Sequence, residues 1–151
     1  MTSSSGDILL ILKGLMESQR FAVLATDDQG QPYTFLMAFA ATDDLKQLVL
    51  VTERGTHKYT NLKSNKRVAL LIDDRENKGS DTQEAVAITV IGEAQEVEEE
   101  EGRSLLDLYL ARHPYLDGFI RSPSSAIVQV KVKSYQVITR FQEVFEWHVE
   151  H

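Results

Sequence analysis

The sequence predicts a mainly β protein, folded as an antiparallel, Greek-key-like β-barrel with peripheral helices. Three observations predict this fold. Most of the chain divides into apolar, β-branched segments of strand length. Polar turn signals separate these segments by a few residues, as in antiparallel barrels. Helical spacing recurs in only three segments, and no repeat or linker divides the 151 residues, so we expect one domain over residues 1–151, with residues 1–6 flexible.

The first half of the chain is expected to contain a helix and three strands. Apolar residues recur at helical spacing over Asp7–Ser18, with Asp7 as the N-cap. The next segments are apolar and partly β-branched, and acidic residues separate them. The strands are therefore expected over 21–26, 32–42 and 47–52, with turns at 27–30 and 43–44.

The second half is expected to alternate helices with longer strands. Gly92 lies inside an alternating segment and predicts a bulge or a sharp bend there. The acidic run at 98–101 favours a helix start, and His113-Pro114 favours the end of that helix. We expect helices over 56–64 and 98–111, strands over 67–73, 85–97, 126–132 and 135–149, and an exposed loop over 74–84.

Composition limits the classes of function. The formal net charge of −7 and the pI of about 5.1 argue against general nucleic-acid binding and against adhesion to anionic lipid. No apolar run approaches the ~20 residues that span a bilayer. The absence of cysteine excludes disulfides and thiolate chemistry, and the N-terminus lacks the basic start of a secretion signal. A cytoplasmic protein without a metal site is expected.

The segment from Val51 to Lys58 gathers two hydroxyls, an arginine, a histidine and a lysine where a strand gives way to a short helix. One interpretation is structural: Thr56 is an ordinary N-cap, and the charged residues are solvated. The other is functional: Thr52, Thr56, free backbone N–H groups and Lys58 bind one phosphate, with Arg54 or His57 adding contacts.

The order of several moderate motifs favours the functional interpretation. Along about residues 20–140 the chain resembles the pyridoxamine 5′-phosphate oxidase-like flavoproteins, which are FMN-binding split β-barrels. The motifs that carry this resemblance are Gln31-Pro32, Thr52 through Lys58, Asn61-Leu62, Asn65-x-Arg67-Val68, Val90 through Ala94, the acidic helix, and His113-Pro114.

The resemblance implies a homodimer with FMN in grooves at the subunit interface and a small-molecule substrate or electron donor. Thr52, Thr56, His57 and Lys58 match the phosphate-binding segment, which Val51 precedes and which includes Arg54. Phe35, Leu36 and Met37 match the strand beside the flavin ring, and the segment 87–89, with Thr89, matches the part that reaches the flavin from the partner. Two ionic contacts of the oxidases are missing, since Phe35 and Ala40 occupy those places.

The resemblance therefore implies an FMN-dependent oxidoreductase of unknown substrate, with Phe35, Met37 and Phe39 either against the ring or in the barrel core. A different class also fits: a non-catalytic module that binds and carries or senses a flavin, a deazaflavin or haem. In the haem version the axial ligand would be His57, His113 or His148. A barrel that has lost its ligand is a third possibility.

Overall fold

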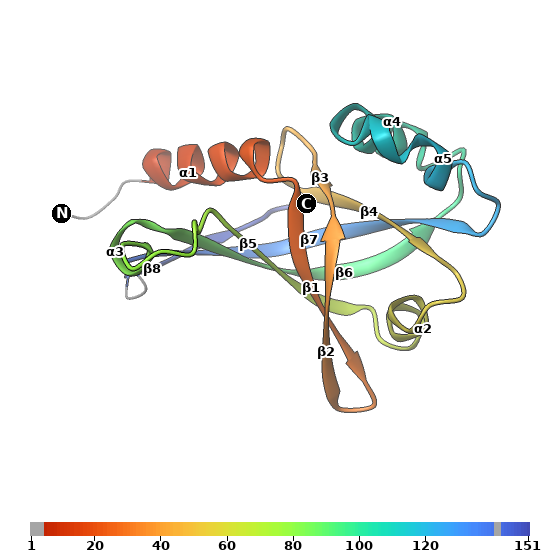
Figure 1. The fold of residues 1–151 in the computed structure, drawn as a ribbon, viewed down its shortest axis with the longest axis horizontal. Helices are drawn as coiled ribbons and strands as arrows, with labels where there is room; N and C mark the ends of the chain where they lie inside the picture. Colours follow the sequence, from red (N-terminus) through yellow and green to blue (C-terminus); the bar gives the residue numbers. More distant parts are fainter. Residues whose placement is uncertain (1–4, 141–142) are drawn as a thin grey trace.

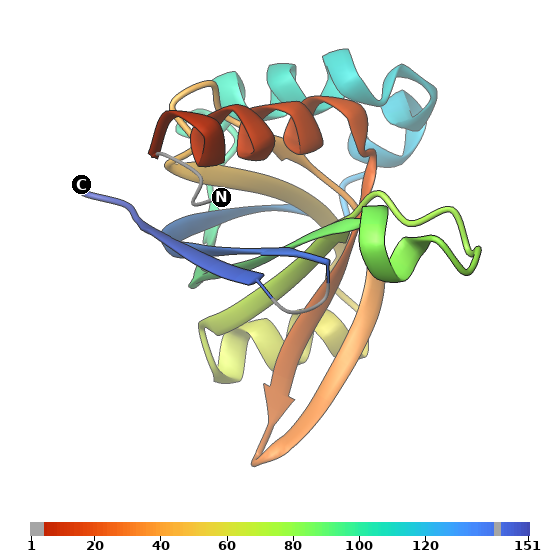
Figure 2. The ribbon, with the colours of Figure 1, turned by 90° about the vertical axis from the view of Figure 1, so that its left-hand side faces the viewer.

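An eight-stranded antiparallel sheet curls into a half-barrel with helices around it in the computed structural model, which describes residues 5–140 and 143–151 (Figures 1 and 2). The strand order is β2-β1-β5-β6-β7-β4-β3, and β8 pairs with β7. The strands are β1 (Phe21–Asp28), β2 (Gln31–Ala38), β3 (Ala40–Ala41), β4 (Gln47–Glu53), β5 (Arg67–Asp73), β6 (Val86–Val97), β7 (Ser125–Thr139) and β8 (Glu143–His148). The predicted fold class, a mainly β antiparallel barrel with peripheral helices, is confirmed.

The helices lie on two sides of this sheet. Figure 2 shows α1, α4 and α5 together on one side, while α2 lies on the opposite side, near the projecting hairpin of β1 and β2. The helices are α1 (Ser5–Ser18), α2 (His57–Ser64), α3 (Asp81–Glu84), α4 (Arg103–Arg112) and α5 (Asp117–Ile120), with a 3₁₀ turn, η1, at Pro114–Leu116. In the described part of the chain, no helix is long and apolar enough to cross a membrane.

One bent segment connects the two ends of the sheet. β2 and β3 lie at opposite ends of the strand order, yet Phe39 alone separates them in the chain. The predicted single strand over 32–42 is therefore two strands: β2 pairs with β1, and β3 pairs with β4. The chain changes partner at Phe39, whose side chain is fully buried. This exchange leaves the barrel open along one edge of β2.

The predicted bulge at Gly92 is confirmed. The pairing of β6 with β7 shifts register between Ile91 and Gly92, where Ile91 faces Ser134 and Gly92 faces Val132, so that Lys133 is the extra residue. The buried positions of β7 consequently change from even to odd numbers after Val132. This change made one strand look like two, and the predicted strands over 126–132 and 135–149 are instead β7 followed by β8, with residues 141–142 of the second prediction outside the described residues.

The acidic run does not start a helix. Residues 99–102 form turns, and α4 begins at Arg103, after the N-cap Gly102. The backbone N–H of Gly102 donates to the carbonyl of Glu98. At the N-terminus the helix begins at Ser5, two residues before the predicted cap Asp7, so Ser5 and Gly6 of the segment predicted to be flexible are helical, and residues 1–4 lie outside the described residues. The predicted loop over 74–84 contains the short helix α3.

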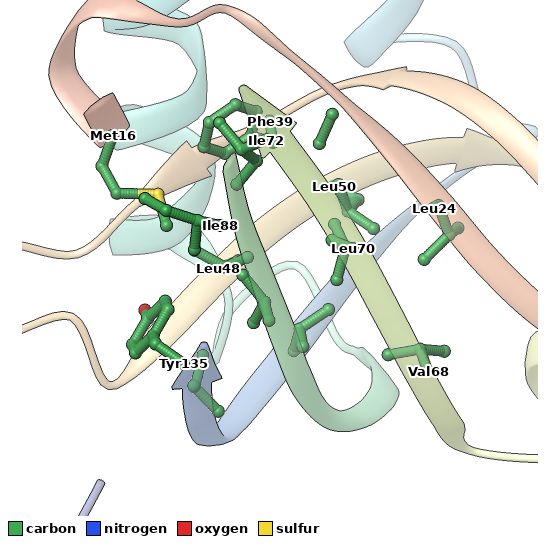
Figure 3. Packing of buried hydrophobic residues seen from close by; sticks show 14 of the residues in the cluster. Met16, Leu24, Phe39, Leu48, Leu50, Val68, Leu70, Ile72, Ile88 and Tyr135 are labelled. Carbon is green, nitrogen blue, oxygen red and sulfur yellow. The ribbon is translucent and has the colours of Figure 1, made fainter. Parts of the chain in front are cut away.

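The core fills the inside of the curled sheet. Figure 3 shows side chains from β1, β4, β5 and β6 converging with Phe39 and with Met16 of α1. The alternation of buried and partly exposed positions along β1 and β5 matches the period of two that predicted these strands. A smaller apolar cluster, centred on Tyr109 of α4, packs on the other face of β4. The two apolar clusters hold the curled sheet together. The helix α2 and the unpaired edge of β2 lie at the side where the barrel is open.

Candidate functional site

The candidate site is formed by the edge strand β2 and the start of α2, where Phe35 meets His57 and Lys58; the region between these two elements is called the groove below. All residues of β2, from Gln31 to Ala38, pair with β1 on one side. Among the described strands, none pairs with the other side of β2. In such a strand, alternate residues direct their backbone N–H and C=O groups away from the ladder. The segment of Phe35, Leu36 and Met37 therefore offers backbone hydrogen-bonding groups to a planar ligand in the groove.

Two threonine hydroxyls meet at the opposite wall. Thr56 is the N-cap of α2: its Oγ1 accepts a hydrogen bond from the backbone N–H of Tyr59 and donates one to the carbonyl of Glu53 at 2.8 Å. The Oγ1 atom of the buried Thr52 lies 3.4 Å away. The capping interpretation of Thr56 is confirmed, and a helix that starts at His57 has no intrahelical acceptor for its first N–H groups. These hydroxyls and N–H groups together suit an anion.

An aromatic and cationic cluster bridges the two walls. The Nζ atom of Lys58 lies 5.9 Å from the ring centroid of Phe35, within the range of a cation–π contact. The ring of His57 meets the ring of Tyr33 at 4.6 Å between centroids, nearly edge to face, and that of Phe35 at 6.3 Å. The structure thus brings Phe35 of the predicted ring strand together with His57 and Lys58 of the predicted phosphate segment. Tyr33, a neighbour on the same face of β2, was missed, although its i, i+2 spacing from Phe35 could have indicated it.

The tip of the β1–β2 hairpin also reaches this cluster. The Nε2 atom of His57 lies 3.1 Å from Oδ2 of Asp28, the last residue of β1. Both side chains are partly exposed. A two-residue turn follows, in which Gln29 and Gly30 both have positive φ angles, as a type I′ turn requires. The predicted turn is therefore confirmed, and it places a carboxylate beside the candidate phosphate segment.

The guanidinium of Arg54 is directed to another partner. Its Nε and Nη2 atoms donate to Oε2 of Glu96 on β6, and its Nη1 donates to the carbonyl of Pro123. Tyr59 donates its hydroxyl to the second carboxylate oxygen of Glu96 at 2.6 Å. Burial raises the pKa of Glu96, but the hydrogen bonds from Tyr59 and Arg54 outweigh it and hold that pKa below its ordinary value. Arg54 and Tyr59 thus connect the start of α2 to β6 through Glu96.

The other predicted residues divide between the core and the outer surface. Met37 and Phe39 belong to the barrel core, and Val51 to the smaller cluster under α4. Phe35 is half-buried, whereas Leu36 is 72% exposed on the outer face of the sheet. Of the three apolar residues proposed to contact the ring, Met37 and Phe39 thus have core positions, and Phe35 alone borders the groove.

Thr89 lies on the same outer face as Leu36, but three strands away. The register pairs Leu36 with Val23, Val23 with Leu71, and Leu71 with Thr89. Three strand spacings amount to about 14 Å, so Thr89 does not reach the groove. The large apolar side chains of Phe21, Leu36 and Ile91 stay exposed on this face.

The histidines differ in their surroundings. His113 is the C-cap of α4, in agreement with the helix end predicted at His113-Pro114, but its side chain is fully buried, and both ring nitrogens have partners: Nε2 the carbonyl of Phe39 at 2.8 Å, and Nδ1 the hydroxyl of Tyr115. Its ring is therefore not free to bind a haem iron without rearrangement. His148 is exposed on β8 beside Glu146, far along the chain from the groove. His57 is the one of these three that lies at the groove.

Comparison with known proteins identifies a family. Residues 12–139 match the model of the family described as pyridoxamine 5′-phosphate oxidase. A search of curated protein sequences found no match.

Solved structures share the fold at low sequence identity. A heme-binding protein from Mycobacterium smegmatis superposes with a TM-score of 0.82 at 14% identity, over 98% of this chain and 59% of that one, so this chain spans little more than half of that protein. The heme storage protein HutZ from Vibrio cholerae superposes with a TM-score of 0.72 at 17% identity, over 90% and 92% of the two chains. A FAD-binding protein from Mesorhizobium loti gives 0.68 at 17% identity, over 91% and 95%.

Proposed function

This chain belongs to the pyridoxamine 5′-phosphate oxidase family, and on that premise we propose that it binds FMN and acts as an FMN-dependent oxidoreductase. The observation that carries the proposal is the pairing of a hydroxyl-rich helix start with an unpaired strand edge across one groove. The start of α2 suits a phosphate, the unpaired edge of β2 suits a planar ring, and FMN carries both groups.

The residues of the groove fit FMN chemically. Thr52, Lys58 and the first backbone N–H groups of α2 would hold the phosphate dianion through charge-assisted hydrogen bonds, and Thr56 would join them by turning its hydroxyl from the carbonyl of Glu53 to the phosphate. Phe35 would lie against the ring, and the backbone of β2 beside it would hydrogen-bond its polar edge. When bound, FMN supplies hydride or electron transfer, while the protein orients the ring and controls access to it. Among the described residues of this site, we assign none as a catalytic acid or base.

The residues at 35 and 40 argue against vitamin B6 phosphate as substrate. They are Phe35 and Ala40, where the oxidases proper carry an arginine and a lysine, and Ala40 is fully buried. We therefore assign no substrate and expect a small molecule or an electron donor at the open side of the groove.

We further propose that the protein is a homodimer in which each cofactor contacts residues of both subunits. The outer face of β1, β2, β5 and β6 carries exposed Phe21, Leu36 and Ile91, and apolar area of this kind typically marks a protein interface. Thr89 lies on this face, about 14 Å from Leu36 along the same row of strands. It would therefore reach the flavin of a second subunit packed on this face.

Haem binding without turnover is a second candidate. Two proteins of the same fold are described as heme-binding or heme storage proteins. In this chain, His57 offers a partly exposed imidazole at the groove, whereas the ring of His113 is buried and paired. A carrier or sensor of haem would use His57 as axial ligand, and a deazaflavin would use the flavin contacts.

Absorbance spectra of the purified protein distinguish these functions. Protein as isolated, and again after titration with FMN, should show flavin bands and a stoichiometry of one FMN per chain. Reduction of the bound flavin by a nicotinamide donor would support an oxidoreductase. A Soret band on haem addition that is lost in His57→Ala, with no FMN bound at micromolar concentration, would replace the first proposal by the second. The absence of both would leave a barrel without a ligand.

A further inference from the structure

His57 is held by the β1–β2 hairpin. Asp28 lies 3.1 Å from its Nε2 atom, and the ring of Tyr33 meets the imidazole nearly edge to face at 4.6 Å. The side chains of His57 and Asp28 are 47% and 39% exposed, so solutes can reach the pair. The imidazole that the phosphate segment offers is therefore already in contact with a carboxylate.

The two acidic residues at the hairpin tip have different roles. Oδ2 of Asp27 accepts the backbone N–H of Gly30 at 3.0 Å and the side-chain amide of Asn65 at 3.4 Å, so Asp27 stabilises the turn and connects it to the end of α2. The hydrogen bond of the Asp28 carboxylate comes from His57. The turn does not depend on Asp28, and a change there alters the contact with His57 more than the hairpin itself.

We propose that Asp28 competes with the phosphate of the ligand for His57 and so lowers the affinity of the site; this inference rests on the proposed FMN site. The Nε2 proton of His57 can be donated to the carboxylate or to a phosphate oxygen, but not fully to both. Partly exposed pairs are weak enough for an incoming dianion to displace the carboxylate.

The test compares FMN with riboflavin, which carries the same ring and no phosphate. Affinities are measured by quenching of flavin fluorescence for the wild type, Asp28→Asn, His57→Gln and the double variant. Because the carboxylate contributes about as much as an exposed ion pair, Asp28→Asn should tighten FMN binding by about 1.5- to 5-fold and leave riboflavin unchanged. The same change made in the His57→Gln background should have no effect.

Asp43→Asn serves as the control, since it removes the same charge at the turn between β3 and β4. It should leave both affinities unchanged, and thermal unfolding of each variant checks that the fold is kept. Unchanged FMN affinity in Asp28→Asn overturns the inference while the FMN site stands. A gain in FMN affinity from Asp28→Asn that persists in the His57→Gln background also overturns the inference, as does a gain that riboflavin shares. If no variant binds FMN, the proposed function fails first, and this inference falls with it.

Discussion

The Nε2 atom of His113 lies 2.8 Å from the carbonyl oxygen of Phe39, and both residues are fully buried. Phe39 is the point at which one strand leaves β1 and joins β4, and its own N–H donates to the carbonyl of Arg20. The neutral imidazole satisfies both of its neighbours, because Nε2–H donates to Phe39 while Nδ1 accepts from the hydroxyl of Tyr115. His113 thus connects the end of α4 to the bend between β2 and β3.

Stability should fall as the solution is acidified through the titration of His113. Burial lowers the pKa of His113 below its ordinary 6.5, which the hydrogen bond to Phe39 only partly offsets. The folded protein therefore binds a proton at His113 less readily than the unfolded chain does. The contribution of the neutral His113 side chain to folding stability is complete above about pH 6.5 and decreases as the pH falls below it. Urea unfolding at pH 7.5 and 5.5 should show a smaller difference for His113→Gln than for the wild type. Equal differences would contradict the assignment.

Gly92→Ala should destabilise the fold. A β-carbon at this position would lie 2.6 Å from the backbone carbonyl oxygen of Lys131 and 3.0 Å from a methyl group of Val130, so the bulged pair of strands would have to separate. The expected loss is about 1–3 kcal/mol, the usual cost of overpacking. Gly14→Ala is the matched control, since nothing lies within 4 Å of its added methyl and it sits on an exposed part of α1. It should raise stability slightly, and equal losses in the two variants would refute the proposed cause.

Lys58→Ala should weaken FMN binding by about 1.5–3 kcal/mol, the usual scale of a hydrogen bond to a charged group. Isothermal titration calorimetry measures the change, with riboflavin as the ligand that lacks the phosphate. Lys13→Ala, on the helix at the opposite side of the sheet, removes the same charge and should leave the affinity unchanged. Unaltered FMN affinity in Lys58→Ala would rule out the assigned phosphate contact.

Leu36→Glu should convert the proposed dimer into a monomer. Leu36 is 72% exposed on the apolar outer face, on the edge strand β2, and a buried, unpaired carboxylate in an interface is costly. Light scattering after size exclusion should give a mass near the 17.1 kDa of one chain for this variant and near twice that for the wild type. Leu10→Glu, at a side chain 70% exposed on α1, is the control and should remain dimeric. A dimer that survives Leu36→Glu would place the interface elsewhere.

The sequence was most informative where structure is local. The period of two along 21–26 and 67–73 and the capping role of Thr56 could be predicted, because each depends on neighbours a few residues away. The bulge at Gly92 was predicted from the residue type alone, although the carbonyl that approaches it belongs to the distant Lys131. Along β7 the buried positions change from even to odd numbers at the bulge at Lys133, which depends on the pairing with β6. The sequence pattern therefore looked like two strands, and that prediction was wrong.

The tertiary structure decided which side chains meet. Arg54 pairs with Glu96, which lies 42 residues away, and His57 contacts Asp28, 29 residues before it. His113 is buried against a carbonyl 74 residues before it, although its place before a proline resembled that of an exposed helix end. Local patterns report the conformation of a segment, whereas these contacts depend on the order in which strands pair and on where the chain changes partner at Phe39. The amino-acid sequence alone therefore indicated the family and the segment that could hold a phosphate, and the curling of the sheet determined which of its charges face the groove.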